Sequence, residues 1–428
     1  MRTLHGNNYV SVTGHAVLFY SLSLTSLFAA ATASGAVFEK YGRTFQVGPN
    51  PSTIAIADLN GDGWPEILTA NVGRLGDPNE ELPANDEVSF LLAAGNLTYV
   101  SQPPLRSGYA PYGIVVANLD ALKAPDVVVG SFMATRDRHL TLFRNIGDNL
   151  FETIYFSATA DGLAYTKHLD GDGQPVFPKP GITAVAVTDI NHDSYRDVIA
   201  TGWTSDVVLV FPGVPEGYLG APKALRASGG PRDLVVADLD ADGEPDLAAT
   251  LYSIGELAVW KGNPNGEFVP AGRFASRGKL PHRIRSGDMN GDGKTDLVVS
   301  HCHAEDSVVI FYGEGNLQFG TSQEINLGTD RAILEHEIRD IVLGDFNGDR
   351  RTDVAAACFR SGQVTILINT SADGRIPQDF SSENIRFSED AAPRALAVGD
   401  LNQDGALDLA VALWKSNSVS LLLGSAKK

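Results

Sequence analysis

Oxygen-bearing side chains recur at fixed spacing in one short loop, which is clearest in the stretch SGDMNGDGKTDLVVS, residues 286–300. Aspartate or asparagine stands at the first, third, fifth and ninth positions of this loop, and the seventh residue offers its backbone carbonyl. A hard cation such as Ca²⁺ takes about six to eight oxygen ligands, and glycine after the fifth position permits the sharp turn that wraps them. Mg²⁺ fits less well, because it requires stricter octahedral geometry and keeps several waters. The spacing therefore predicts a calcium-binding hairpin that closes at its ninth residue.

The same nine-residue pattern occurs six times, so about six structural calcium sites are expected. Turns rich in aspartate, asparagine and glycine explain a single copy without metal, but they explain six copies in register poorly. Ser194 and Arg350 replace the glycine in two copies and should weaken those sites. A seventh copy, residues 118–126, has Leu122 at the fifth position and Lys123 in place of the glycine, so no metal is expected there. The predicted ligands, with the seventh residue acting through its carbonyl, are Asp58, Asn60, Asp62, Trp64 and Glu66; Asp189, Asn191, Asp193, Tyr195 and Asp197; Asp238, Asp240, Asp242, Glu244 and Asp246; Asp288, Asn290, Asp292, Lys294 and Asp296; Asp345, Asn347, Asp349, Arg351 and Asp353; and Asp400, Asn402, Asp404, Ala406 and Asp408.

The seven copies divide the chain into equivalent units. They begin at residues 58, 118, 189, 238, 288, 345 and 400, and are separated by 60, 71, 49, 50, 57 and 55 residues. Short apolar runs surround each loop, such as LVVAD before it and DLAAT and ELAVW after it, and a further strand follows a glycine-rich turn. Runs of about four to six residues are too short for helices and are typical of buried strands. Four strands per unit predict an all-β fold, a seven-bladed β-propeller with calcium-binding β-hairpin loops.

Both ends of the chain predict how the ring closes. After Asp408 the sequence contains two strands, LAVAL and SVSLLLG, so the last blade lacks its outer strand. One extra strand, VFEKYGRTFQV at residues 37–47, precedes the first loop. Pairing of this N-terminal strand with the last blade would remove an exposed edge and latch the ring. Residues 34–428 are therefore expected to form one propeller domain.

An apolar segment near the start, AVLFYSLSLTSLFAAA, overlaps the pattern Ala31-Thr32-Ala33, which is typical of a signal-peptide cleavage site. We expect residues 1–33 to be removed on export and the protein to be secreted and extracellular, or periplasmic or on the cell surface in a bacterium. A membrane anchor is the alternative. No other segment of the sequence approaches the roughly 20 apolar residues that a spanning helix needs.

Charge and cysteine content narrow the expected partners. A formal net charge of −19 argues against nucleic acid, because binding it requires a cationic surface. The two cysteines, Cys302 and Cys358, rule out a disulfide-stapled scaffold but leave one bridge open. The run His301-Cys302-His303 does not favour zinc, because alternate residues of a strand point to opposite faces. We expect a monomer.

The repeats resemble a known family. The stretches DLNGDGWPEILTA, DMNGDGKTDLVVS and DLNQDGALDLAVALWKSNSVSLLLG are similar to FG-GAP/VCBS repeats, which build the seven-bladed propeller of integrin α-subunit heads and of many secreted microbial proteins. The resemblance covers nearly all of residues 37–424, and it implies calcium at the positions named above. The family includes adhesion modules, carbohydrate-binding modules and some polysaccharide lyases, so the fold does not decide the function.

A second set of residues should lie at the channel mouth on the face opposite the calcium loops. Counting back six residues from each loop start gives Ser52, Tyr112, Thr183, Arg232, His282, Arg339 and Arg394. A positive patch in an otherwise acidic protein would favour a ligand with a carboxylate or sulfate group. The alternative is that these side chains cap strands or pair with nearby acids such as Asp233 and Asp340.

A ring of mostly aromatic residues is expected on the same face. It could stack on sugar rings, although an aromatic residue that recurs in every unit more often packs between adjacent blades. Counting forward six residues from each ninth position gives Val72, Phe132, Trp203, Tyr252, Cys302, Phe359 and Trp414.

Taken together, these features favour a secreted binding or adhesion module for a glycan or an extracellular protein over an enzyme. The alternative is a polysaccharide lyase acting on a uronate-containing glycan, in which a cation neutralises the sugar carboxylate and Tyr112 or His282 removes the adjacent proton. Arg232, Arg339 and Arg394 would then bind the substrate. The sequence contains no H-E-x-x-H zinc motif, G-x-S-x-G elbow or phosphate-binding loop.

Overall fold

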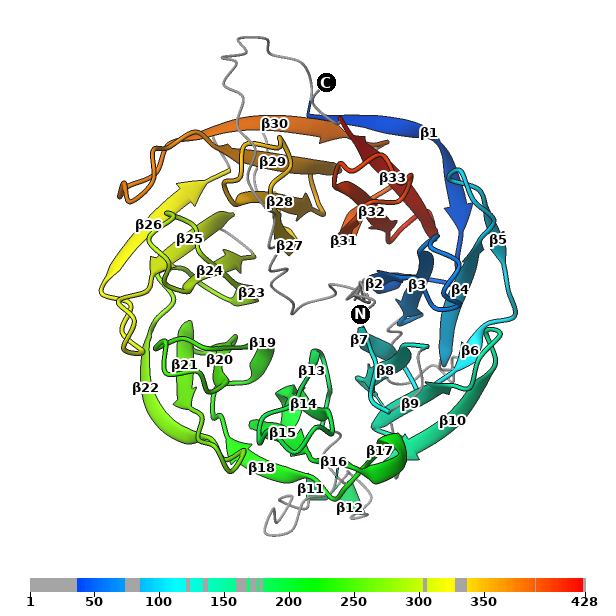
Figure 1. Cartoon of the computed structure of the whole chain (residues 1–428), viewed down its shortest axis with the longest axis horizontal. Coiled ribbons are helices and arrows are strands. Elements are labelled where there is room, and N and C mark those ends of the chain that lie inside the picture. Colours follow the sequence, from blue (N-terminus) through cyan, green and yellow to red (C-terminus); the bar gives the residue numbers. More distant parts are fainter. Residues whose placement is uncertain are drawn as a thin grey trace, which may run out of the picture.

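A ring of seven antiparallel β-sheets surrounds a central axis in the computed structural model (Figure 1). The structure describes residues 37–73, 85–120, 124–133, 138–158, 180–302, 306–327, 337–388 and 390–425, and the short strands at 168–169 and 175–176. The predicted all-β, seven-bladed propeller is therefore confirmed. The predicted signal peptide, residues 1–33, lies outside the described residues. None of the helices in the described part has the length and apolar character needed to cross a membrane.

Each blade runs from an inner strand at the axis to an outer strand at the rim. Blades one to seven consist, in this order, of β2 (Pro51–Ala57), β3 (Glu66–Asn71), β4 (Glu87–Ala93) and β5 (Tyr99–Ser101), with β6 (Leu105–Arg106) also on β4; β7 (Pro111–Ala117), β8 (Asp126–Ser131), β9 (Leu140–Asn145) and β10 (Phe151–Phe156); β13 (Val185–Thr188), β14 (Asp197–Gly202), β15 (Val207–Phe211) and β18 (Lys223–Arg226); β19 (Pro231–Ala237), β20 (Asp246–Leu251), β21 (Glu256–Lys261) and β22 (Val269–Ala275); β23 (Pro281–Gly287), β24 (Asp296–His301), β25 (Ser307–Tyr312) and β26 (Thr321–Asn326); β27 (Ile338–Gly344), β28 (Asp353–Cys358), β29 (Gln363–Asn369) and β30 (Phe380–Arg386); and β31 (Pro393–Gly399), β32 (Asp408–Leu413), β33 (Ser418–Gly424) and β1 (Phe38–Gln46).

Six smaller elements complete the described part. The short strands form two ribbons, and both helices are single 3₁₀ turns. They are β11 (His168–Leu169) with β12 (Pro175–Val176), β16 (Gly213–Val214) with β17 (Tyr218–Leu219), η1 (Trp203–Ser205) and η2 (Pro215–Gly217).

The apolar runs of the sequence form the strands that are buried on both faces. β24, with the sequence DLVVSH, is buried along its whole length, whereas the outer strand β22 is almost entirely exposed. The core lies between neighbouring blades, where Val115 and Val128 of blade two pack with Val185 and Val198 of blade three. Because each sheet buries both faces against its neighbours, the inner strands lack the alternation of apolar and polar residues that a half-buried sheet shows.

The N-terminal strand lies at the outer edge of the last blade, where β1 pairs antiparallel with β33 (Figure 1). Its register runs from Phe38 opposite Gly424 to Gln46 opposite Ser418. Phe38 is buried, and its ring centroid lies 5.4 Å from that of Phe346 in blade six. The strand thus covers an edge that would otherwise expose unpaired backbone groups, and it joins blades six and seven.

A register shift near the start of most inner strands positions the candidate ligand residues. The shift occurs at the second residue of the strand in β2, β7, β23, β27 and β31 and extends over two residues in β19. A bulge of this kind leaves a residue out of the ladder and changes the direction of its side chain. The residues at these shifts include Tyr112, Arg232, His282, Arg339 and Arg394.

The closure predicts a measurable loss on truncating one side chain. Phe38→Ala removes a buried ring between blades six and seven and should lower the free energy of unfolding by about 3 kcal/mol, measured by urea denaturation. Thr44→Ala, at an exposed position of the same strand, is the matched control and should change stability little. Equal stability of the two variants would contradict the role given to β1.

Candidate functional site

Seven hairpins join the first and second strands of the blades and lie on one face of the ring. They are called hairpins one to seven and comprise residues 58–66, 118–126, 189–197, 238–246, 288–296, 345–353 and 400–408. In hairpin one, Asp58 Oδ1 and Oδ2 accept the N–H groups of Gly61 and Gly63 at 2.7 and 2.9 Å. Asn60 Oδ1 accepts the N–H of Asp62 at 2.8 Å. Local backbone donors therefore hold the first and third side chains in place.

In all six complete hairpins, one oxygen of the first side chain accepts the N–H of the sixth residue. The fifth-position carboxylate accepts the N–H of the seventh residue at 2.8 to 2.9 Å, which is why the side chain at that seventh position varies freely. The fourth and sixth residues adopt left-handed backbone conformations. Glycine suits these positions, whereas Ser194 and Arg350 hold φ angles of 73° and 71° with a side chain present, which is strained. The strain gives a reason for the weaker metal binding expected in hairpins three and six.

The ninth residue of each hairpin, called the closing acid, is buried at the start of the second strand. Asp296 shows the pattern: one carboxylate oxygen accepts the N–H of Met289 at 2.8 Å and the other accepts the N–H of Gly313 at 2.7 Å. The first donor lies in the hairpin and the second follows the third strand, so one carboxylate ties three strands together. The other closing acids are Glu66, Asp126, Asp197, Asp246, Asp353 and Asp408.

Burial raises the pKa of the closing acids. For Asp296 burial raises the pKa to about 7 although its two N–H donors act in the opposite direction, and the carboxylates of Asp288 and Asp292 add to the increase. A cluster of carboxylates in which the charged form is disfavoured is a suitable place for a cation. Burial likewise raises the pKa of Glu66, Asp353 and Asp408 to about 7, of Asp126 and Asp246 to about 6, and of Asp197 above its ordinary value.

The donor set of the hairpins fits a hard divalent cation. Carboxylate oxygens of Asp238, Asp240 and Asp246 in hairpin four all lie within 4.8 Å of one another. The Oδ1 atoms of Asp189 and Asp240 are buried without a hydrogen-bond partner among the described residues. Oxygen ligands of this type are those that Ca²⁺ takes, and a bound ion would partner these atoms.

Hairpin two lacks the fifth-position oxygen and the glycine in its sequence, with Leu122 and Lys123 at these positions. Its closing acid Asp126 still accepts two backbone N–H groups, from Leu119 at 2.9 Å and Asn145 at 2.8 Å. Leu122 and Lys123 lie outside the described residues. The closing acid therefore makes its backbone hydrogen bonds even in the hairpin whose sequence lacks a fifth-position oxygen.

Four of the five candidate ligand residues come together at the axis, on the side of the ring opposite the hairpins. The hydroxyl of Tyr112 accepts hydrogen bonds from the Nη2 atoms of both Arg232 and Arg394, although the three residues are far apart in sequence. His282 Nε2 lies 3.3 Å from Arg232 Nη2. These side chains come from the inner strands β7, β19, β23 and β31.

Arg339 lies beside this group with its charge already paired. Its guanidinium forms an ion pair with Glu337 and stacks over the ring of Phe359, with its Cζ atom 5.6 Å from the centroid. Its backbone carbonyl accepts hydrogen bonds from Arg283 Nε at 3.3 Å and Arg394 Nη1 at 3.5 Å. Because Glu337 already balances its charge, Arg339 contributes to the site mainly through its backbone carbonyl, which holds Arg283 and Arg394 in place.

Ser52 and Thr183, the first and third members of the predicted mouth set, serve the scaffold instead. Ser52 Oγ donates to backbone carbonyls of blades one and two, and Thr183 Oγ1 donates to the carbonyl of Arg232 at 2.6 Å. Both hydroxyls are buried and bridge neighbouring inner strands. For these two positions, the interpretation as strand-end contacts is correct.

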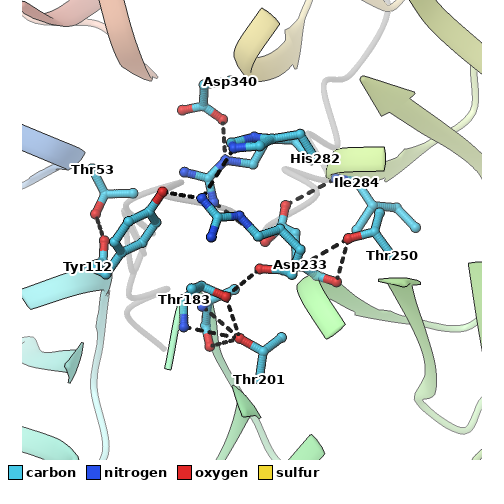
Figure 2. Close-up of polar contacts among 12 residues, drawn as sticks. Thr53, Tyr112, Thr183, Thr201, Asp233, Thr250, His282, Ile284 and Asp340 are labelled. Atoms are coloured by element: carbon cyan, nitrogen blue, oxygen red, sulfur yellow. Dashed lines mark hydrogen bonds and ion pairs between the residues drawn. The ribbon is translucent and has the colours of Figure 1, made fainter. Parts of the chain in front are cut away.

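Two further arginines were missed by counting along the sequence. Arg285 pairs with Asp233 Oδ2 at 2.9 Å and with Asp340 Oδ1 at 2.8 Å, and Arg283 Nε lies 3.3 Å from Asp340 Oδ1. Figure 2 shows Asp233 and Asp340 on either side of these guanidinium groups. The sequence carried a signal for them, because PHRIRSG places two charges in an inner strand that is otherwise expected to be apolar.

The arginine cluster, defined as Arg232, Arg283, Arg285, Arg339 and Arg394, has a surplus of positive charge. Among the described residues, these five guanidinium groups face three carboxylates, those of Asp233, Asp340 and Glu337, and Glu337 is shared with Arg360, so at least two positive charges are left over. Arg283 Nη2, Arg285 Nε and Arg339 Nε are buried without a hydrogen-bond partner among the described residues. Burial lowers the pKa of Arg394 to about 10, and three neighbouring arginines act in the same direction.

The charges change the protonation of Tyr112 and His282. Burial by itself raises the pKa of Tyr112, but Arg232, Arg394 and two further arginines outweigh it and lower the pKa to about 8. Burial, assisted by the same arginines, lowers the pKa of His282 well below its ordinary value. His282 is therefore neutral near pH 7 and adds no charge to the patch, contrary to the sequence-based inclusion of histidine among its cations.

The predicted aromatic residues form a belt around the cluster. Ring centroids lie 5.9 Å apart for Tyr112 and Phe132, 5.5 Å for Phe132 and Trp203, and 5.5 Å for Trp203 and Tyr252. Arg232 stacks over three of these rings, with its Cζ atom 4.4 Å from the centroid of Trp203. The rings thus contact one another across blade boundaries and pack against an arginine, which agrees with packing between blades.

The remaining sequence-based alternatives concern the cysteines. Cys302 and Cys358 are both buried free thiols, so they form no bridge. The sulfur of Cys302 lies 3.8 Å from Tyr252 Oη, whereas that of Cys358 lies 3.6 Å from Thr365 Oγ1. His303 lies outside the described residues.

A small cavity lies between the inner strands. Its volume is about 10 Å³, and it is lined by Arg283, Arg285, Asp233 and Asp340 together with backbone and apolar atoms of neighbouring blades. This volume holds about one water molecule. A larger ligand does not fit this cavity and would have to bind outside it, next to the buried Arg394.

The lowered pKa of Tyr112 predicts a tyrosine that ionises early. One of the 12 tyrosines should titrate near pH 8 in ultraviolet absorbance, and Tyr112→Phe should remove this step while Tyr109→Phe, at an exposed position, should not. Because the pKa is lower in the folded chain, the free energy of unfolding should rise above about pH 8 in the wild type relative to Tyr112→Phe. A titration without an early step would contradict the charge surplus around Tyr112.

Comparison with known proteins identifies the repeats. A family model described as FG-GAP-like repeat matches residues 189–249, 238–299, 288–356 and 345–411, which together span more than half of the 428 residues. Integrin alpha-PS2 of Drosophila melanogaster is 26% identical over 190 residues, covering 40% of this chain. The chain spans 13% of the length of that relative.

Solved structures share the architecture at low sequence identity. BBS1N in complex with ARL6DN superposes with a TM-score of 0.61 at 13% identity, covering 92% of this chain and 98% of that one. A streptogramin B lyase structure gives a TM-score of 0.53 at 12% identity, covering 91% and 98%. At such identity the likeness shows the fold alone. With four matched repeats and seven blades, the chain belongs to the FG-GAP-like repeat family.

Proposed function

We propose that this protein is an extracellular binding module whose ligand presents a carboxylate to the arginine cluster. The observation that carries the proposal is the surplus of two positive charges, held with unpartnered buried N–H groups in a chain of net charge −19. Guanidinium groups bind carboxylates with paired, directional hydrogen bonds. An acidic group at the mouth would neutralise the surplus and partner the free donors.

An acidic side chain of an extracellular protein is a better ligand than a sugar. The aromatic faces that could stack on a sugar ring are already in contact with one another and with Arg232. The similarity to Integrin alpha-PS2 supports an extracellular protein partner and an extracellular location. An acidic glycan is the other outcome that the binding experiment below distinguishes.

Calcium in the hairpins is the second part of the proposal. The hairpins present carboxylate and amide oxygens at the spacing that Ca²⁺ takes, and a buried oxygen of Asp189 in hairpin three lacks a hydrogen-bond partner among the described residues. The side chains at the first, third, fifth and ninth positions would hold the ion, and the ion would offset their mutual repulsion. Because it binds the folded state, calcium would stabilise the ring.

Removal of calcium should lower the melting temperature. At a concentration 100 times its dissociation constant, each bound ion adds about 2.7 kcal/mol to the free energy of unfolding, so several sites together produce a large shift. Calorimetry with and without EDTA measures this, and EDTA presaturated with calcium is the control. An unchanged melting temperature, with no alkaline-earth metal found by elemental analysis of the purified protein, would overturn the calcium proposal.

Binding of acidic polymers should depend on Arg394. Poly-L-glutamate represents an acidic protein segment and polygalacturonate an acidic glycan, and both are tested by biolayer interferometry at fixed ionic strength. Arg394→Met should weaken binding at least about tenfold, whereas Arg394→Lys should retain part of it and Arg386→Met, on the exposed outer strand β30, should change little. Melting curves of each variant show that it is folded.

The outcomes separate the candidate functions. Preference for poly-L-glutamate supports the protein ligand, and preference for polygalacturonate supports the glycan. Equal binding by wild type and Arg394→Met would reject the arginine cluster as the site.

The lowered pKa of Tyr112 favours a lyase as the second candidate, since a phenolate can accept a proton. Unsaturated products from polygalacturonate, lost in Tyr112→Phe, would identify that activity.

A further inference from the structure

The third strand of every blade places one residue directly across from the closing acid. In blade four, Leu247 pairs with Trp260, so the next residue, Lys261, lies opposite Asp246. In blade two, Val127 pairs with Phe143, so Arg144 lies opposite Asp126. The equivalent residues of blades one, three, five, six and seven carry no positive charge and are Leu92, Pro212, Tyr312, Ile368 and Leu423.

Both cationic side chains reach the ligand positions of their own hairpin. Lys261 Nζ contacts Asp240 Oδ2 and lies 2.7 Å from Asp242 Oδ2, which are side chains of the third and fifth positions. Arg144 Nε lies 2.8 Å from Asp120 Oδ2, the third position of hairpin two. A positive charge carried by the chain therefore occupies the place where other hairpins would need an ion.

Hairpin four also differs from the other complete hairpins in its charge. Its third residue is Asp240, whereas the third residue elsewhere is asparagine, so it carries one carboxylate more among the first, third, fifth and ninth positions, and Glu244 adds another at the seventh. In the other five, the amide nitrogen of that asparagine lies 2.9 to 3.3 Å from the fifth-position Oδ2. In hairpin four Lys261 takes this contact with Asp242 Oδ2 instead. The additional acid and the lysine thus form a matched pair.

We propose that Lys261 is the resident cation of hairpin four and replaces the metal there, as Arg144 does at Asp120 in blade two. The protein then binds five divalent cations, in hairpins one, three, five, six and seven. A calcium ion entering hairpin four would have to break both contacts of Lys261 and would meet its positive charge at short range. The inference rests on the proposed binding of calcium by the remaining hairpins.

The test counts ions and locates them. The full chain is stripped with EDTA and reloaded with calcium chloride, its stoichiometry is measured by native mass spectrometry, and each hairpin is examined by anomalous diffraction after soaking with terbium. Wild type should bind five ions. Lys261→Met should bind a sixth, located in hairpin four, and Lys261→Gln is a second variant in case the first does not fold.

Two control variants test whether the loss of any positive side chain increases the number of bound ions, or only the loss of Lys261. Lys223→Met removes an exposed lysine from the outer strand β18, outside every hairpin, and should still bind five ions. Arg144→Met should also bind five, because Leu122 supplies no oxygen to hairpin two, and its loss of thermal stability should not be restored by calcium. An ion in hairpin four of the wild type, or five ions in the folded Lys261 variants, would overturn the proposal. Absence of ions from every hairpin would instead overturn calcium binding itself.

Discussion

The whole ring depends on one interaction, the burial of a carboxylate at the start of the second strand of every blade. An isolated buried charge is costly unless hydrogen bonds and opposite charges compensate it. Each closing acid has two backbone N–H donors, one from its hairpin and one from the end of the third strand. The carboxylate therefore does more than close a metal loop, since it fixes the spacing of three strands. Hairpin two keeps this interaction although its sequence has no fifth-position oxygen, so the backbone hydrogen bonds of the closing acid do not depend on a complete set of oxygen ligands.

Because the closing acids constrain the hairpin ends of the blades, the residues at the opposite ends of the inner strands are free to vary. The hairpin ends repeat nearly the same residues in every blade, because each must satisfy the same carboxylate. The other ends carry Ser, Tyr, Thr, Arg, His, Arg and Arg in turn, and the hydroxyls of Ser52 and Thr183 donate to backbone carbonyls of adjacent inner strands. The charged members meet at the axis, where strands from four blades bring together residues that are more than 280 positions apart, as the contact of Tyr112 with Arg394 shows. Rigid strands with variable ends are a common way to build a binding site.

Features that repeat along the chain could be predicted from the sequence, whereas contacts that depend on strand register could not. The spacing of the hairpins predicted the seven blades and the strand that pairs with β33, and counting six residues back predicted that Tyr112, Arg232, His282 and Arg394 share one end of the ring. Arg283 and Arg285 were missed because the bulge at His282 changes which side chains face the axis. The neutral state of His282 follows from burial among arginines, which no spacing reveals. Lys261 and Arg144 were missed because their hairpin partners lie across a strand pair, at a distance in sequence that varies with each loop.

The charges on the two ends of the ring act independently. An inner strand of seven residues extends about 23 Å at roughly 3.3 Å per residue, whereas salt screens exposed charges over about 8 Å at physiological ionic strength. The negative hairpins therefore do not neutralise the arginine cluster for a ligand that approaches from the opposite end. The net charge of the chain determines long-range repulsion, but the nearest groups determine recognition, and those groups are guanidiniums. An acidic protein can for this reason present a basic site to an acidic partner, and cations bound at the hairpins would reduce the long-range repulsion without changing the site.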